Sequence, residues 1–328
     1  MNEKKTVLDI DRLSVKLKTE RGMFTAVNQV SFQIDSGETV ALVGESGCGK
    51  SLTSLSIMGL IAKKLGVVEG SIRFKDKVLN QLREREMRAI RGYDISMIFQ
   101  EPMTSLNPVH SIGRQIDEVF RLHTSASKQE RRAQTIQMLR KVGIPRAEKI
   151  VHDFPHQLSG GMKQRVMIAM AMACQPDLLI ADEPTTALDV TIQAQILDLM
   201  NDLKRKANTA ILLITHDLGV VAEMADRVMV MYYGEIVEEA DVQTLFASPR
   251  HPYTVGLLHS IPSLDRENKR LTPIEGNVPI LGEVQDGCPF RSRCTHAMER
   301  CAREKPPMIH AGKHAVRCWV YADQEVAI

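Results

Sequence analysis

The sequence has no long apolar run, because none of its apolar stretches approaches the ~18 residues that a membrane-spanning helix needs. Its first residues, MNEKKTVLDIDRLSV, contain lysines but lack the apolar segment of a secretory signal. We therefore expect a chain that is made in the cytoplasm and stays there unless a partner recruits it to a membrane.

The sequence also lacks an excess of one charge and has few aromatic residues. Its 42 lysine and arginine residues are balanced by 40 aspartate and glutamate residues, and aromatic residues make up only 4% of the chain. Proteins that follow a nucleic-acid backbone are usually strongly basic, and those that stack bases need aromatic side chains. The composition therefore gives no indication of a nucleic-acid partner. Internal repeats and low-complexity segments are absent as well.

What the sequence has is the composition of an ordinary globular protein, with 44% apolar and 25% charged residues. Its 328 residues suggest about two domains. Short, continuous apolar runs at 39–43, 178–181 and 210–215 alternate with helical patterns. Such runs are typical of strands that are buried on both faces of a mostly parallel sheet. We therefore predict an α/β domain over residues 1–240.

Two changes in sequence pattern and composition subdivide the chain further. Residues 112–122 and 129–142 carry apolar side chains at helical spacing, which predicts a helical insertion over about residues 102–165. After residue 240 the chain becomes rich in proline, glycine and histidine. We place a domain boundary near Asp241 and treat residues 241–328 as a small C-terminal extension.

The most specific motif is a glycine-rich loop directly after the apolar run TVALV. It matches GxxxxGK[ST] and consists of Gly44, Glu45, Ser46, Gly47, Cys48, Gly49, Lys50 and Ser51. The glycines let backbone N–H groups surround phosphate oxygens, the lysine supplies a positive charge, and the serine offers a hydroxyl to Mg²⁺. We expect a helix to begin near Lys50. The alternative, a glycine-rich turn with an exposed lysine, fits the flanking strand and helix patterns poorly.

The loop contains a cysteine, Cys48, whose ionisation can be predicted from its surroundings. Because a phosphate-binding loop is electropositive, the thiolate of Cys48 could be favoured, and alkylation would then block the loop. The alternative is that Cys48 only fills space.

Two other apolar runs end in residues that can act on a phosphate. The run at 178–181 is followed by Asp182, which can hold Mg²⁺, and by Glu183, which can act as general base or orient an attacking water. The run at 210–215 is followed by His216, which can bond the γ-phosphate or that water. Alone, each could be a strand entering a loop. Next to a phosphate-binding loop, the combination favours nucleotide hydrolysis.

A second candidate anion site opens the helical pattern at 162–174. Ser159, Gly160 and Gly161 precede it, which could make either a helix cap or an anion site at a helix N-terminus. One bound ATP needs only one phosphate-binding loop. The second site therefore makes sense if it serves the nucleotide of another subunit.

Taken together, these motifs resemble an ABC-type ATPase cassette. The resemblance rests on the loop at 44–51, on LLIAD at 178–182 and on LSGGMKQR at 158–165, and it covers about residues 6–240. It implies a RecA-like core plus a helical subdomain, with ATP held between the loop of one cassette and the LSGG segment of another. It also implies that Gln100 contacts Mg²⁺ and couples to membrane subunits, and that Asp189 belongs to the loop at 187–189 between cassettes. Phe24 is the candidate that stacks on adenine, and the alternative is that it is a plain core phenylalanine.

The rest of the chain resembles dipeptide and oligopeptide importer ATPases. The likeness lies in FQEPMTSLNP at 99–108, in RHPYT at 250–254 and in the cysteine-containing tail. It implies a peripheral subunit at the cytoplasmic face of the membrane that powers peptide import. A second, homologous ATPase subunit, two permease subunits and an extracytoplasmic peptide-binding protein would be its partners. The alternatives are a nickel importer, a soluble ABC ATPase of DNA repair or translation, and a P-loop metabolic kinase, in which the LSGG segment would have no task.

Four of the six cysteines gather near the end of the chain. Cys288, Cys294, Cys301 and Cys318 have the spacing C-x₅-C-x₆-C-x₁₆-C, whereas Cys174 has the pattern of a buried helix residue. In a cytosolic chain such a cluster indicates metal or cluster ligands before disulfides. Four thiolates suit a [4Fe–4S] cluster or a structural zinc ion, for which His296, His310 and His314 could compete as ligands. The family resemblance favours the [4Fe–4S] cluster.

Overall fold

The computed structural model describes residues 5–20, 22–100, 105–186, 188–260, 274–284 and 286–322. The chain folds into two compact units. The first unit comprises Met1–Leu8, Gln33–Glu38 and Phe74–Leu213, and the second comprises Asp9–Phe32, Thr39–Arg73 and Ile214–Ile328. Among the residues with described positions, no helix is long and apolar enough to cross a membrane.

The first unit is built on parallel strands with helices beside them. Its strands lie in the order β8-β7-β6, and Ile95 of β6 pairs with Leu178 of β7 in parallel register. All side chains of β7 and β8 are buried, as the continuous apolar runs predict. The strands are β5 (Lys77–Val78), β6 (Ile95–Ile98), β7 (Leu178–Asp182) and β8 (Ala210–Thr215, whose last two residues belong to the second unit).

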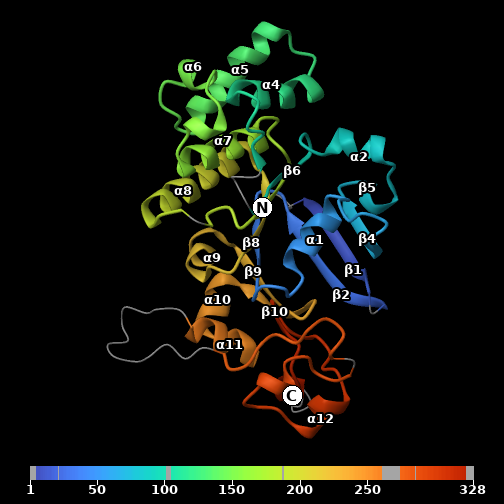
Figure 1. Cartoon of the computed structure of the whole chain (residues 1–328). Coiled ribbons are helices and arrows are strands. Elements are labelled where there is room, and N and C mark those ends of the chain that lie inside the picture. The colour runs from blue at the N-terminus through green and yellow to red at the C-terminus, as the bar shows by residue number, and fades with distance from the viewer. Residues whose placement is uncertain are drawn as a thin grey trace. The chain divides into compact units, whose positions relative to one another are not determined.

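Two helices of the first unit, α4 and α5, lie where the sequence predicts helical spacing at 112–122 and 129–142. Helices α4 to α7 pack on one another and form the green group in Figure 1. Three of them have capped starts, because Ser111 caps α4, Ser127 and Glu130 make a capping box at α5, and Ser159 caps α7. The helices are α2 (Glu84–Ile90), α4 (Ile112–His123), α5 (Lys128–Lys141), α6 (Ala147–Ile150), α7 (Gly160–Met172) and α8 (Val190–Ala207), with 3₁₀ turns at Leu79–Gln81 and Pro155–Gln157.

The second unit contains two groups of strands. One has the order β2-β1-β4 and consists of most of β1 (Thr6–Thr19), β2 (Gly22–Asp35) and β4 (Gly66–Phe74). The other has the order β11-β12-β10-β9-β3, in which β3 and β9 are parallel and the remaining pairs antiparallel. Its strands are β3 (Thr39–Val43), β9 (Arg227–Tyr232), β10 (Glu235–Asp241), β11 (Ile309–Ala311) and β12 (His314–Val316).

The C-terminal extension adds its own strands to this second group. Val316 of β12 pairs with Glu238 of β10, and Ala315 pairs with Glu239. Residues of β9 and β10 form a buried apolar cluster together with Tyr253 and Phe290. The helices of the second unit are α1 (Lys50–Ile57), α9 (Leu218–Met224), α10 (Val242–Ala247), α11 (Pro252–His259), α12 (Glu299–Arg303) and α13 (Trp319–Ala322), with the 3₁₀ turn η3 at Arg291–Arg293.

Candidate functional site

The glycine-rich loop lies in the second unit, between the end of β3 and the start of α1 at Lys50. Gly44, Gly47 and Gly49 have φ values of 152°, 81° and 111°, which side chains rarely adopt. A Cβ atom on Gly44 would lie 2.2 Å from the carbonyl oxygen of Met231 in β9. The loop therefore follows a path that only glycine permits, closely packed on the neighbouring strand.

The side chain of Lys50 is held inside this loop and is only 7% exposed. Its Nζ donates to the carbonyl oxygens of Gly44 at 2.7 Å and Glu45 at 3.0 Å. The half-buried Ser51 follows in the first turn of α1, which contains no acidic residue. A fixed ammonium group at a helix N-terminus is an arrangement that attracts phosphate.

The prediction of a favoured thiolate at Cys48 is wrong. Its side chain is fully buried, and burial raises the pKa of the thiol more than the neighbouring Lys50 ammonium lowers it. The electropositive character of the loop is thus outweighed by the cost of moving a thiolate out of water. Cys48 instead fills space, and its Sγ lies 3.7 Å from the Nζ of Lys50.

In the first unit, Gln100 and Glu183 meet although 83 positions separate them in the sequence. The Nε2 of Gln100 donates to Oε2 of Glu183 at 3.0 Å, and the hydroxyl of Thr186 donates to the same oxygen at 2.9 Å. Glu183 has a φ of 49°, whereas Asp182 before it is buried and only 4% exposed. A strained backbone at a held carboxylate is typical of catalytic positions. Thr186 was not predicted as a site residue, and its closeness to Glu183 in the chain is the only signal that could have identified it.

The LSGG segment also lies in the first unit. Ser159 is the N-cap of α7 and its hydroxyl accepts from the N–H of Met162 at 3.4 Å. A Cβ on Gly161 would lie 2.8 Å from Cγ2 of Ile192 in α8, whereas a Cβ on Gly160 would meet nothing within 4 Å. Gly161 is therefore needed for helix packing, and Gly160 leaves the start of α7 open. Asp189 caps the adjoining α8 by accepting from the N–H of Ile192 at 2.9 Å.

His216 is exposed in the second unit, where it joins β8 to α9. The next residue, Asp217, caps α9 by accepting from the N–H of Gly219 at 2.8 Å. The end of the strand and the capped helix therefore fix the backbone on both sides of His216. Of the loop at 187–189, Ala187 lies outside the described residues, as does much of the segment after Gln100.

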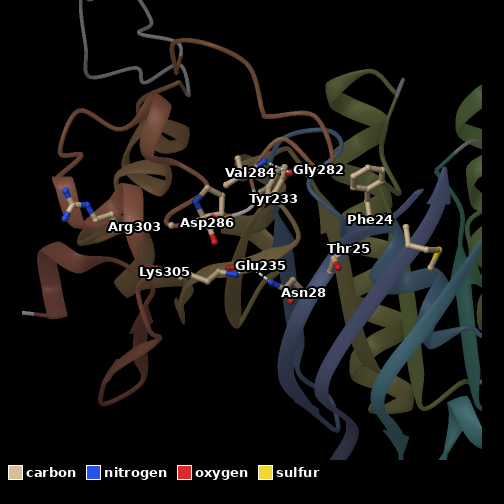
Figure 2. A pocket seen from close by; sticks show the side chains of 13 residues that line it. Phe24, Thr25, Asn28, Tyr233, Glu235, Gly282, Val284, Asp286, Arg303 and Lys305 are labelled. Carbon is tan, nitrogen blue, oxygen red and sulfur yellow. Dashed lines mark hydrogen bonds and ion pairs between the residues drawn. The ribbon is translucent and has the colours of Figure 1, made fainter. Parts of the chain in front are cut away.

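Phe24, the candidate for adenine stacking, lines a cavity of about 550 Å³ within the second unit (Figure 2). Residues of β2 and of the β9–β10 turn form one wall, and Gly282, Val284, Asp286, Arg303 and Lys305 of the extension form the other. The half-buried ring lies so close to Gly282 that a Cβ there would be 2.3 Å from it. Across the cavity, Asn28 donates to Glu235 at 2.7 Å and Lys305 pairs with the same carboxylate.

The four clustered cysteines all line one small cavity of about 10 Å³, together with His296. This volume corresponds to about one water molecule. Burial, and to a smaller extent the neighbouring cysteines, raise the pKa of the Cys288 thiol to about 11. Of the predicted competing ligands, His314 instead bonds to Glu238 at 2.7 Å. No group of three or more His, Cys, Asp or Glu in the described part of the chain is arranged to hold a metal ion. The thiols are gathered, but their present spacing does not support the predicted cluster.

The sequence is similar to two protein families and to known transport ATP-binding proteins. A family described as ABC transporter matches residues 27–186, and one described as oligopeptide/dipeptide transporter, C-terminal region, matches residues 237–301. The chain is 54% identical to the oligopeptide transport ATP-binding protein AppD of Bacillus subtilis, over 97% of this chain and 98% of that protein. It is 52% identical to the dipeptide transport ATP-binding protein DppD of the same organism, over 96% and 94%.

The fold is also similar to that of a solved cassette. A dimeric structure of a post-hydrolysis state of an ATP-binding cassette, bound to ADP and Pi, superposes with a TM-score of 0.63. The two sequences are 28% identical, and the match covers 72% of this chain and 98% of that one.

Proposed function

The chain belongs to the ATP-binding subunits of ABC transporters of the oligopeptide and dipeptide type, and we propose on this premise that it hydrolyses ATP to power peptide import. One observation carries the proposal: the likeness to peptide transport ATP-binding proteins runs over nearly the whole chain and includes their C-terminal region. Such a subunit works as a dimer at the cytoplasmic face of the membrane, with permease subunits and a substrate-binding protein. Nickel importers and soluble ABC ATPases lack this support.

We further propose that the chain consists of a cassette and a C-terminal extension. The cassette comprises residues 1–240, with its helical subdomain at about 102–165, and residues 241–328 form the extension. The two family matches, at 27–186 and 237–301, are compatible with a boundary near Asp241. In the chain this position separates β10 from α10.

Each candidate residue receives a task in ATP hydrolysis. The loop Gly44–Ser51 holds the phosphates, with Lys50 as its charge. Mg²⁺, when bound, would be held by Ser51, Asp182 and Gln100, and it would neutralise charge on the phosphates. The LSGG residues and Asp189 complete the site of the partner subunit. The fixed lysine and the glycine-only path of the loop support this assignment.

Glu183 is the proposed general base. A water attacks the γ-phosphorus, its proton passes to the Glu183 carboxylate, and the bond to the bridging oxygen breaks to give ADP and phosphate. The hydrogen bonds from Gln100 and Thr186 orient that carboxylate. His216 then stabilises the γ-phosphate or the attacking water.

We expect cells that lack this chain to lose uptake of labelled di- and oligopeptides. The native chain should restore uptake and the Glu183→Gln chain should not, because import depends on hydrolysis. Nickel uptake, measured in parallel, is the control for the rival solute. If peptide uptake stayed normal in a strain without redundant peptide importers while nickel uptake fell, the peptide assignment would be refuted and the ATPase assignment would remain.

The finer proposal for the tail is that its four cysteines bind a [4Fe–4S] cluster, with zinc as the alternative. Support comes from the family resemblance and from the presence of all four thiols around one cavity. We expect anaerobically purified full-length chain to be brown and to contain iron and acid-labile sulfide. Cys301→Ser should lose both, whereas Cys174→Ser, outside the cluster, should keep both. A colourless chain, with or without stoichiometric zinc, would refute the iron–sulfur proposal.

A further inference from the structure

Glu45 of the glycine-rich loop is held by two side chains of the C-terminal extension. Its backbone N–H donates to the hydroxyl oxygen of Tyr253 at 2.8 Å. Its two carboxylate oxygens accept from Nη1 and Nη2 of Arg293 at 2.6 and 3.0 Å. The same residue's carbonyl oxygen accepts from Lys50, so Glu45 connects the extension directly to the lysine of the loop.

The Arg293 side chain is fixed on every side and is only 3% exposed. Besides Glu45, it donates to the carbonyl oxygens of Glu275 at 2.9 Å and Ile274 at 3.3 Å. Its guanidinium lies 5.9 Å from the ring centre of Phe290. Two parallel hydrogen bonds between guanidinium and carboxylate fix direction as well as distance. Arg293 can therefore hold the Glu45 side chain in one orientation.

Tyr253 is fixed equally well, because its side chain is fully buried and its ring packs on Tyr232 with ring centres 4.7 Å apart. Its N–H donates to Nδ1 of His251 at 3.1 Å. Burial lowers the pKa of His251 to about 3, so that this ring is neutral at physiological pH and can accept the bond. The buried Glu238 carboxylate in turn accepts from the N–H groups of Arg250 and His251 at 2.7 and 2.8 Å.

These contacts involve two segments of the extension that have no assigned role in ATP hydrolysis. Tyr253 belongs to the RHPYT segment, and Arg293 lies between Cys288 and Cys294. We propose that Tyr253 and Arg293 are positioning residues, which hold Glu45 so that the loop and Lys50 keep the conformation that receives the triphosphate of ATP. This inference rests on the proposed function of the loop. The ATP site of this chain is then incomplete without its C-terminal extension.

Arg293 also compensates the negative charge of Glu45. The Glu45 carboxylate lies in a loop that is to receive a polyanion, and an unpaired carboxylate there would oppose binding. Arg293 neutralises this charge from a buried position. Loss of Arg293 should therefore weaken ATP binding more than loss of the Tyr253 hydroxyl does.

ATP binding by the full-length chain tests the proposal, by titration with MgATP at fixed salt. We expect Arg293→Gln to raise the Kd about tenfold and Tyr253→Phe to raise it about threefold, as the loss of charged and neutral hydrogen bonds implies. Arg293→Lys should fall between the native chain and Arg293→Gln, because it keeps the charge but loses the paired geometry. Tyr253→Phe keeps the ring and its packing, so it separates positioning from loss of folding.

Arg291→Gln is the matched control. Arg291 lies in the same 3₁₀ turn, but its guanidinium bonds to the carbonyl oxygens of Asp286 and Ala302 inside the extension. If Arg293 acted only by stabilising the extension, Arg291→Gln would weaken ATP binding equally, and the proposal would fail. It would fail too if Arg293→Gln bound ATP within about twofold of the native Kd. We expect Arg291→Gln to bind as the native chain does.

Two further measurements distinguish the possible failures. In the assembled transporter, Arg293→Gln should raise the KM for ATP and leave kcat near the native value, because the catalytic carboxylate is untouched. The double variant Glu45→Gln with Arg293→Gln should bind ATP no more weakly than Arg293→Gln alone, and additive losses would contradict coupling through Glu45. If Lys50→Ala also bound ATP normally, the proposed function of the loop itself would be at fault.

Discussion

We expect the Glu183→Gln chain to bind ATP with native affinity and to hydrolyse it at least about 100-fold more slowly in the assembled transporter. The amide has nearly the shape of the carboxylate, and its oxygen can still accept the bonds from Gln100 and Thr186. It cannot take a proton from the attacking water, so the loss falls on the chemical step. Phosphate release and ATP binding, measured on the same preparation, separate the two effects.

A second carboxylate of the first unit provides the control for this change. Glu118 lies exposed on α4 and pairs with Arg121 at 2.9 Å. Glu118→Gln should hydrolyse ATP at the native rate, because exposed ion pairs contribute little and this one is confined to the helix surface. If Glu183→Gln turned over ATP as fast as Glu118→Gln does, Glu183 would not be the general base.

The strands that position the site could be predicted because their signal is local. The apolar runs at 39–43 and 210–215 coincide with β3 and β8, and the run at 178–181 falls one residue short of the end of β7. A strand buried on both faces needs an unbroken run of apolar residues. The loop after β3 was equally readable, since its three positive φ values require the glycines that form the motif.

The features that could not be predicted depend on burial and on distant partners. An electropositive loop favours a thiolate and burial opposes it, and only the structure shows that burial prevails at Cys48. The bonds from Arg293 to Glu45 join residues 248 positions apart. Strands β11 and β12 are three residues each and have no periodicity to detect. Their place beside β10 comes from pairing, which a single sequence does not reveal.

The cysteine-containing tail could be predicted only in part. Its spacing predicted that the four thiols would come together, and all four do line one cavity. Spacing does not determine the distances between the sulfur atoms, and no metal-holding arrangement of His, Cys, Asp or Glu is found in the described part of the chain. The role of Arg293 does not depend on whether the thiols bind a cluster, because its bonds to Glu45 are formed in the chain as described.

Lys50→Ala should abolish measurable ATP binding, with a Kd raised about 100-fold or more. The ammonium group is buried in the loop, where it bonds to the carbonyl oxygens of Gly44 and Glu45. Its removal would take away the charge proposed to face the phosphates, together with the bonds to the two carbonyl oxygens of the loop. Loss of one partner from a buried, charge-assisted contact costs about 3 kcal/mol or more, which corresponds to that change in Kd.

Two variants show which of these losses dominates at Lys50. Lys77→Ala removes an exposed lysine of β5 and should bind ATP as the native chain does. Lys50→Arg keeps the positive charge, but its guanidinium is larger and planar. If the charge matters more than the shape of the loop, Lys50→Arg should bind ATP more tightly than Lys50→Ala does. Arg293→Gln leaves Lys50 in place, so its smaller loss measures what the contact with Glu45 contributes, by position and by charge, without loss of the lysine. Native ATP affinity in Lys50→Ala would refute both the assigned role of Lys50 and the phosphate site built around it.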